Sequence, residues 1–115
     1  MTSGLNTVIY PTKNLERAKA LYASLLGVGP VMDEPYYVQF NTDTQEIGLD
    51  PNGHQKGMTG PVGYWYVEDI DKTIASLVEA GAEINEPVND FGGGNRKVAS
   101  VKDIDGNIVG LIQQD

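Results

Sequence analysis

The chain has 115 residues, 40% of them hydrophobic, which suffices for one ordinary domain or two small halves but not for two large independent cores. Sixteen acidic residues against eight basic ones give a net charge of −8, with the single His54 neutral. Such a charge repels phosphate backbones and anionic lipid headgroups, so neither nucleic acids nor membrane surfaces are expected partners.

The absence of cysteine and the single histidine exclude several kinds of metal site and catalytic group. Cysteine is absent, which excludes disulfides, thiolate metal sites and a cysteine nucleophile, and one histidine excludes a multi-histidine metal centre within a chain. The first residues lack the features of a signal peptide, and no window approaches the roughly 20 apolar residues that span a bilayer. We therefore expect a cytoplasmic protein.

The first half of the sequence predicts one helix among four short strands. Asn14 is a suitable N-cap, apolar residues then recur at three- and four-residue steps, and Gly27 stands where a helix C-terminus favours glycine. The other runs are rich in β-branched and aromatic residues and are separated by polar turns. The predicted elements are a strand over residues 5–10, a helix over 15–26, and strands over 28–32, 36–41 and 46–50.

The second half repeats this order after a loop rich in Gly and Pro. Asp69 or Asp71 caps the second helix, and Gly81 ends it. When the halves are laid on each other, residues 14–16 fall on 69–71 and Gly48 falls on Gly110, which indicates an internal duplication. The predicted elements are a strand over residues 62–67, a helix over 70–80, and strands over 82–84, 97–101 and 107–113.

Three segments carry a resemblance to a known family. They are residues 14–22 followed by 25–27, residues 67–71, and the run Asp103-Ile104-Asp105-Gly106-Asn107-Ile108-Val109-Gly110-Leu111. Together they resemble the vicinal oxygen chelate superfamily, which contains glyoxalase I, extradiol dioxygenases and bleomycin-resistance proteins. Its terminal Asp-Pro-Asp-Gly-Asn turn is matched here except that Ile104 replaces proline.

The resemblance implies an α+β fold and its organisation. It implies a single glyoxalase-like domain of two βαβββ modules, about residues 5–50 and 61–113, linked by the loop 51–60. The modules would form a curved mixed-sheet half-barrel, with the helices outside and a ligand cleft inside.

The resemblance also implies where relatives bind a divalent ion, namely through one side chain from the first and last strand of each module. These positions fall on Thr7, Gly48, Val62 and Gly110. Valine and glycine carry no donor atom, threonine is a poor ligand, and a divalent ion normally needs at least three protein donors. We therefore expect no metal, no cofactor and no metal-dependent catalytic residues, and we expect the two glycines to leave a cavity clear of side chains.

Strand alternation then assigns the lining of the cleft. Tyr64 and Tyr66 offer flat apolar surface with hydroxyl groups, which suits a planar ligand, unless they fill the cleft as core. Trp65 is expected in the core. Glu46 and Asp50 would favour ligands with amines, unless they are solvated strand ends. The expected lining is Thr7, Ile9, Tyr37, Gln39, Glu46, Gly48, Asp50, Val62, Tyr64, Tyr66 and Gly110.

Two loop residues complete the candidate ligand site. His54 is by default a lone exposed histidine, with a place at the cleft rim or a general-base role as the alternative. Phe91 precedes a glycine run, residues 92–94, which we expect to form a mobile flap that closes on a ligand, because glycine permits large backbone changes.

Two functions remain open from the sequence. The first is a metal-free small-molecule binding protein that sequesters or senses a planar compound, including a cationic one. The alternative is a glyoxalase-like lyase, isomerase or dioxygenase with a non-standard metal site around Glu46, Asp50 and His54. By analogy with the family, we expect a homodimer whose partner is a small molecule, not a nucleic acid or a membrane.

Overall fold

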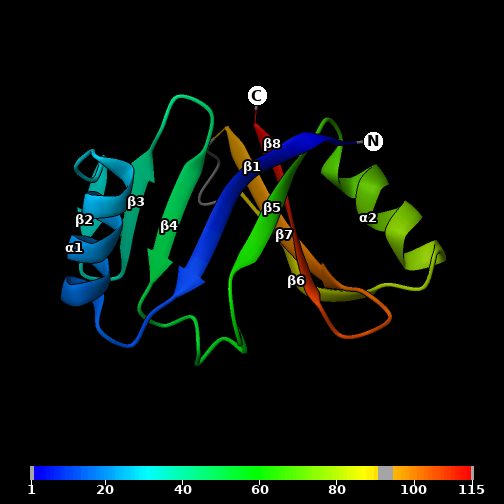
Figure 1. Ribbon diagram of the computed structural model, residues 1–115. Helices are drawn as coiled ribbons and strands as arrows, with labels where there is room; N and C mark the ends of the chain where they lie inside the picture. The colour runs from blue at the N-terminus through cyan, green and yellow to red at the C-terminus, as the bar shows by residue number, and fades with distance from the viewer. Residues whose placement is uncertain (1, 91–94, 115) are drawn as a thin grey trace. The chain divides into compact units, whose positions relative to one another are not determined.

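The computed structural model describes residues 2–90 and 95–114, and over these residues it contains eight strands and two helices (Figure 1). The elements in chain order are β1 (Thr2–Pro11), α1 (Leu15–Leu26), β2 (Met32–Glu34), β3 (Tyr37–Asn41), β4 (Glu46–Asp50), β5 (Val62–Val67), α2 (Ile70–Glu79), β6 (Glu83–Asn89), β7 (Arg96–Lys102) and β8 (Ile108–Gln114). Neither helix is long and apolar enough to cross a membrane.

The chain divides into two compact units. Thr7–Val62 form the first unit, and Met1–Asn6 together with Gly63–Asp115 form the second, so β1 contributes residues to both. The strand order is β2-β3-β4-β1 in the first unit and β1-β5-β8-β7-β6 in the second. Each unit thus contains a β-α-β-β-β run with the same strand order, which confirms the predicted α+β class and the repeated βαβββ arrangement.

Both units contain parallel and antiparallel pairs. The first and last strands of each run are parallel, with Thr7 opposite Glu46 on β1 and β4, and Tyr64 opposite Gly110 on β5 and β8. The remaining pairs within the two runs are antiparallel. In the first unit, Gln39 of β3 lies opposite Gly48, so β4 is flanked by β1 on one side and β3 on the other.

Capping residues begin both helices and end α1 as the sequence predicts, whereas α2 ends at Glu79 with Ala80 as its C-cap, one residue before the predicted Gly81. The Asn14 side chain accepts a hydrogen bond from the backbone N–H of Arg17 at 3.1 Å, and Gly27 ends α1 in the left-handed conformation with φ 73°. In α2 the cap is Asp69, not Asp71, because the Asp69 carboxylate accepts from the backbone N–H of Lys72 at 3.1 Å.

Each helix packs on its own small core. In the first unit, α1 covers Val38 and Phe40 of β3 and Leu49 of β4, all fully buried. Because side chains alternate along a strand, Tyr37 and Gln39 point to the opposite face of β3, as predicted. In the second unit the core consists of Val67, Ile70, Ile74, Ala99 and Leu111.

Several strands differ from their predicted bounds: β1 begins at Thr2 instead of residue 5, and β2 and β6 differ most. The strand expected over residues 28–32 is the short β2, Met32–Glu34, and the one expected over 82–84 extends through β6, Glu83–Asn89. Pro87 does not end β6 because β6 is the edge strand of its unit, where a missing N–H breaks no inner ladder bond. Register shifts against β7 accommodate the irregular segment.

Candidate functional site

A set of polar side chains gathers on the face of the first unit's sheet that lies opposite α1. We call this set the polar sheet face; its members are Thr7, Tyr37, Gln39, Asn41 and Glu46. They come from β1, β3 and β4, at positions that alternate with the buried residues facing α1. Three neighbouring strands thus place hydroxyl, amide and carboxylate groups on one surface.

Hydrogen bonds connect the members of the polar sheet face. The Thr7 hydroxyl, only 4% exposed as a residue, donates to Glu46 Oε1 at 2.8 Å. Gln39 Nε2 donates to Asn41 Oδ1 at 2.9 Å, and the Tyr37 hydroxyl donates to Gln39 Oε1 at 3.4 Å. The bond from Thr7 orients the Glu46 carboxylate, a group whose ionised form accepts hydrogen bonds at about four positions.

The two strand glycines do not leave the clear cavity that the sequence analysis expects. A Cβ atom added at Gly48 would overlap the end of the Tyr37 ring, and one added at Gly110 would lie 2.5 Å from the Tyr64 ring. The space beside each glycine is therefore occupied by a tyrosine from a neighbouring strand. The glycines are needed because the aromatic rings pack directly on the backbone.

Asp50 and His54 are not part of the polar sheet face; their contacts and positions involve the turns that follow β4. The Asp50 carboxylate accepts from the backbone N–H of Asn52 at 2.8 Å and forms an ion pair with Lys56 at 2.9 Å. Asp50 is thus a buried residue that holds the turns following β4, rather than a solvated strand end. His54 lies exposed in those turns, in agreement with its default interpretation.

The ability to bind a metal ion depends on how many donor side chains come close together. Among residues 2–90 and 95–114, no three His, Cys, Asp or Glu side chains come together as a group that could hold a metal ion. The alternative site built on Glu46, Asp50 and His54 is such a group, and it is not formed. Glu46 and Thr7 alone offer too few donors for a divalent ion.

The remaining predicted site residues fall in both units. Ile9 and the buried Val62 belong to the first unit, whereas Tyr64, Tyr66 and Gly110 belong to the second. The Tyr66 hydroxyl donates to the carbonyl of Gln114 at 3.2 Å, so it is engaged within its own unit. Phe91 lies outside the described residues.

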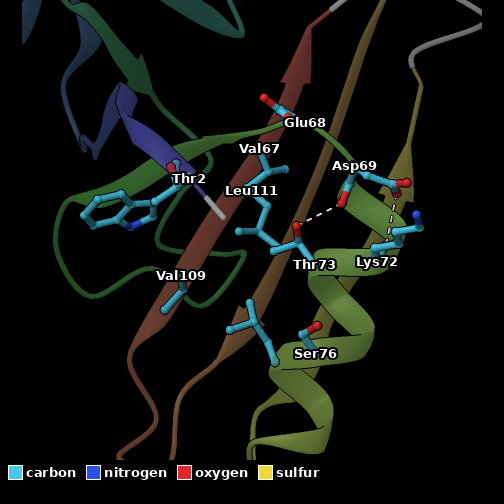
Figure 2. A pocket seen from close by; sticks show the side chains of 11 residues that line it. Thr2, Val67, Glu68, Asp69, Lys72, Thr73, Ser76, Val109 and Leu111 are labelled. Atoms are coloured by element: carbon cyan, nitrogen blue, oxygen red, sulfur yellow. Dashed lines mark hydrogen bonds between the residues drawn. The ribbon is translucent and has the colours of Figure 1, made fainter.

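The second unit also has a groove that sequence reasoning missed. It has a volume of about 610 Å³ and runs between α2 and strands β5 and β8, with Val109 and Leu111 on one side and Ser76 of the helix on the other (Figure 2). Trp65 lines it and is 38% exposed, so the expectation that Trp65 is core is wrong. Alternation of side chains places Trp65 on the helix side of β5, but it does not predict how much of that face of the sheet α2 covers.

Family membership follows from a match over almost the whole chain. Residues 4–111 match the model of the Glyoxalase/Bleomycin resistance protein/Dioxygenase superfamily. The chain belongs to this superfamily. The match agrees with the repeated βαβββ topology and includes the three segments that carry the resemblance. No curated protein matches the chain in sequence.

Solved structures of other superfamily members share the fold at low sequence identity. A superfamily member from Vibrio splendidus 12B01 is 16% identical with a TM-score of 0.73, covering 95% of this chain and 97% of its own. Methylmalonyl-CoA epimerase from Mycobacterium tuberculosis is 18% identical with a TM-score of 0.71, covering 99% and 89%. The Mn(II)-bound glyoxalase from Novosphingobium aromaticivorans is 18% identical with a TM-score of 0.74, covering 97% of this chain but 39% of its own. At such identities the likeness establishes the fold alone.

Proposed function

We propose that this superfamily member binds a small organic molecule without a metal ion and thereby sequesters or senses it. The ligand is planar and carries a positive charge or hydrogen-bond donors. Within the superfamily, this role is similar to that of the drug-binding resistance proteins rather than to that of the metal-dependent enzymes. Within the first unit, the predicted ligand-site residues other than the polar sheet face are Ile9, Gly48, Asp50, His54 and Val62. Tyr64, Tyr66 and Gly110 of the second unit, and Phe91, stay separate predictions.

The observation that carries this proposal is the Glu46 carboxylate held by the buried Thr7 hydroxyl at 2.8 Å. Hydrogen bonds between an ionised group and a ligand contribute about 1.5–3 kcal/mol, more than bonds between neutral groups. The Tyr37 ring and the Gln39 amide on the same face add flat apolar surface and a further polar contact. A planar molecule with an amine or amidine group has the matching chemistry.

A metal-dependent lyase, isomerase or dioxygenase has less support. That function needs at least three donor side chains around an ion, and the family's four positions hold one threonine, one valine and two glycines. The substitute donor Asp50 is bound to Lys56 and to the Asn52 backbone instead. We therefore propose no cofactor and no catalytic residue.

Two further expectations belong to this proposal. We propose that the protein is cytoplasmic and that it forms a homodimer in solution, as superfamily members typically do. A symmetric contact between copies would also cover an edge strand such as β2 or β6, which has a neighbouring strand on one side only in the described sheet.

Thermal unfolding in the presence of planar organic cations tests the binding proposal. We expect such compounds to raise the unfolding midpoint equally with and without EDTA, because ligand binding to the folded state alone stabilises it. Glu46→Gln keeps an acceptor for Thr7 but removes the charge, and it should weaken binding about tenfold. Stabilisation that requires an added divalent metal would instead support the enzyme alternative.

A matched control is Glu34→Gln, which removes one carboxylate from the exposed strand β2 of the same unit. This variant should bind the ligand as the wild type does. Equal binding by the Glu46→Gln and wild-type proteins would contradict the assigned role of Glu46.

A further inference from the structure

Helix α2 covers only part of the sheet in its unit. It packs along β6, β7 and β8 through Ile70 and Ile74, while the groove beside it remains open toward β5. Figure 2 shows Val109 and Leu111 on the strand side of this groove and Ser76 on the helix side. The uncovered strip gives Trp65, the only tryptophan in the chain, its exposed surface.

The groove has an apolar floor and an aromatic wall. Val67 and Leu111 are almost fully buried and form its base, and Leu77 packs against the same core. Trp65 adds the face of an indole ring, which is large, rigid and apolar. A concave surface of this kind favours the apolar or aromatic body of an organic molecule.

The charges at one end of the groove define the kind of molecule further. Glu68, Asp69 and Lys72 line the groove near the start of α2 (Figure 2). Asp69 is engaged as the helix cap, whereas Glu68 has no ion-pair or hydrogen-bond partner within the described residues. The local balance of two carboxylates and one ammonium is negative, as is the whole chain at −8.

We propose that this groove is a second ligand site, separate from the polar sheet face, and that it takes organic cations with an aromatic or aliphatic body. The body lies on the apolar floor, and the cationic group is attracted by the Trp65 ring and the Glu68 carboxylate, which both line the groove. The electron-rich face of tryptophan attracts cations, and a carboxylate lining the same groove adds Coulomb attraction. Anions are disfavoured by the same groups.

Trp65 itself reports on the site, because no other tryptophan contributes to the emission. We expect benzyltrimethylammonium to change the tryptophan emission of the full chain in a saturable way. Benzyl alcohol, which has the same ring without charge, should bind more weakly, and benzoate should bind least. The absence of a saturable change with the cation, or equal affinities for all three probes, would overturn the proposal.

Two variants of the second unit, each lacking one carboxylate, distinguish a direct effect of Glu68 on the bound cation from the effect of the net negative charge of the protein. Glu68→Gln should weaken benzyltrimethylammonium binding about two- to fivefold, as expected for an exposed charge pair. Glu79→Gln removes the same charge at the far end of α2, outside the groove, and should leave the affinity unchanged. Equal affinity for the Glu68→Gln and wild-type proteins would contradict the proposal.

The indole ring and the possibility of self-association are tested separately. Trp65→Leu should abolish most of the binding measured by calorimetry, whereas a structural role alone would leave it intact in the folded variant. Tryptophan emission that shifts with protein concentration in the absence of a probe would indicate that a second copy of the chain occupies the groove, and would overturn the proposal. Glu46→Gln alters only the polar sheet face and Glu68→Gln alters only the groove, so comparing the two variants shows which of the two proposals fails.

Discussion

Gly110 and Tyr64 lie opposite each other on β8 and β5. Their contact allows an estimate of how much a methyl group added at Gly110 would lower the free energy of unfolding. A Cβ atom at Gly110 would lie 2.5 Å from the ring, so the ring or the strand must move. Gly110→Ala should therefore lower the free energy of unfolding by about 1–3 kcal/mol, as overpacking does elsewhere. Chemical denaturation measures this change.

Gly60→Ala is the matched control for that substitution. Gly60 has no heavy atom within 4 Å of an added Cβ and does not need a positive φ. We expect it to leave stability unchanged within about 0.5 kcal/mol. If both alanine variants behave alike, the Tyr64 ring does not require the glycine.

Asp103 provides a second prediction at the scale of one residue, through pH. Its carboxylate accepts hydrogen bonds from the Asn107 side chain and from backbone N–H groups of the terminal turn, and these bonds hold its pKa below the ordinary value. Because the folded pKa is the lower one, the stabilisation is complete above about pH 5 and is lost as pH falls through the lowered pKa.

The acid side of the stability profile tests this assignment. Asp103→Asn should show a smaller loss of stability between about pH 5 and pH 2 than the wild type does. Asp105→Asn serves as the comparison, since Asp105 contributes only its backbone N–H to the turn. An unchanged acid-side profile in the Asp103→Asn variant would show that this carboxylate is not stabilised by folding.

At the scale of one element, α2 depends on its first turn. Asp69 caps the helix by accepting from the Lys72 N–H, whereas Asp71 lies within the first turn and acts only through the helix dipole. Asp69→Ala should cost about 1 kcal/mol, and Asp71→Ala should cost less. Urea denaturation of both variants measures the difference, and a larger loss from Asp71→Ala would contradict the capping role.

The elements also explain where sequence reasoning succeeds. Alternation over residues 36–40 predicts that Tyr36, Val38 and Phe40 form the apolar set and that Tyr37 and Gln39 lie on the other face. The structure agrees for Val38 and Phe40, which are fully buried, whereas Tyr36 precedes β3 and is 60% exposed. The same rule applied to β5 places Trp65 on the helix side, where it is nevertheless exposed. Periodicity determines the side of a strand but not the extent of the helix that covers it.

At the scale of the whole molecule, the state of association is the prediction that remains. We expect light scattering after size exclusion to give about twice the mass of one chain at micromolar concentration. Leu21 and Leu25, four residues apart on α1 and mostly exposed, offer an apolar surface for such contacts. A monomer mass across the micromolar range would contradict the proposed homodimer.

The sequence by itself determined the features that depend on neighbouring residues. The cap Asn14, the repeated βαβββ order and the lack of donor atoms at Gly48 and Gly110 follow from residue types and short-range geometry, whereas the choice of Asp69 over Asp71 as the cap of α2 came from the structure. The resemblance to the superfamily rests on the same local segments, and the family match over residues 4–111 includes them.

Only the tertiary structure decided what lies beside those residues. It placed the Tyr37 and Tyr64 rings beside the two glycines and joined Thr7 of β1 to Glu46 of β4. It also left Trp65 beside an open groove. These contacts join segments far apart in the chain, and they depend on side-chain rotamers and on the position of a helix over its sheet, which no local pattern encodes.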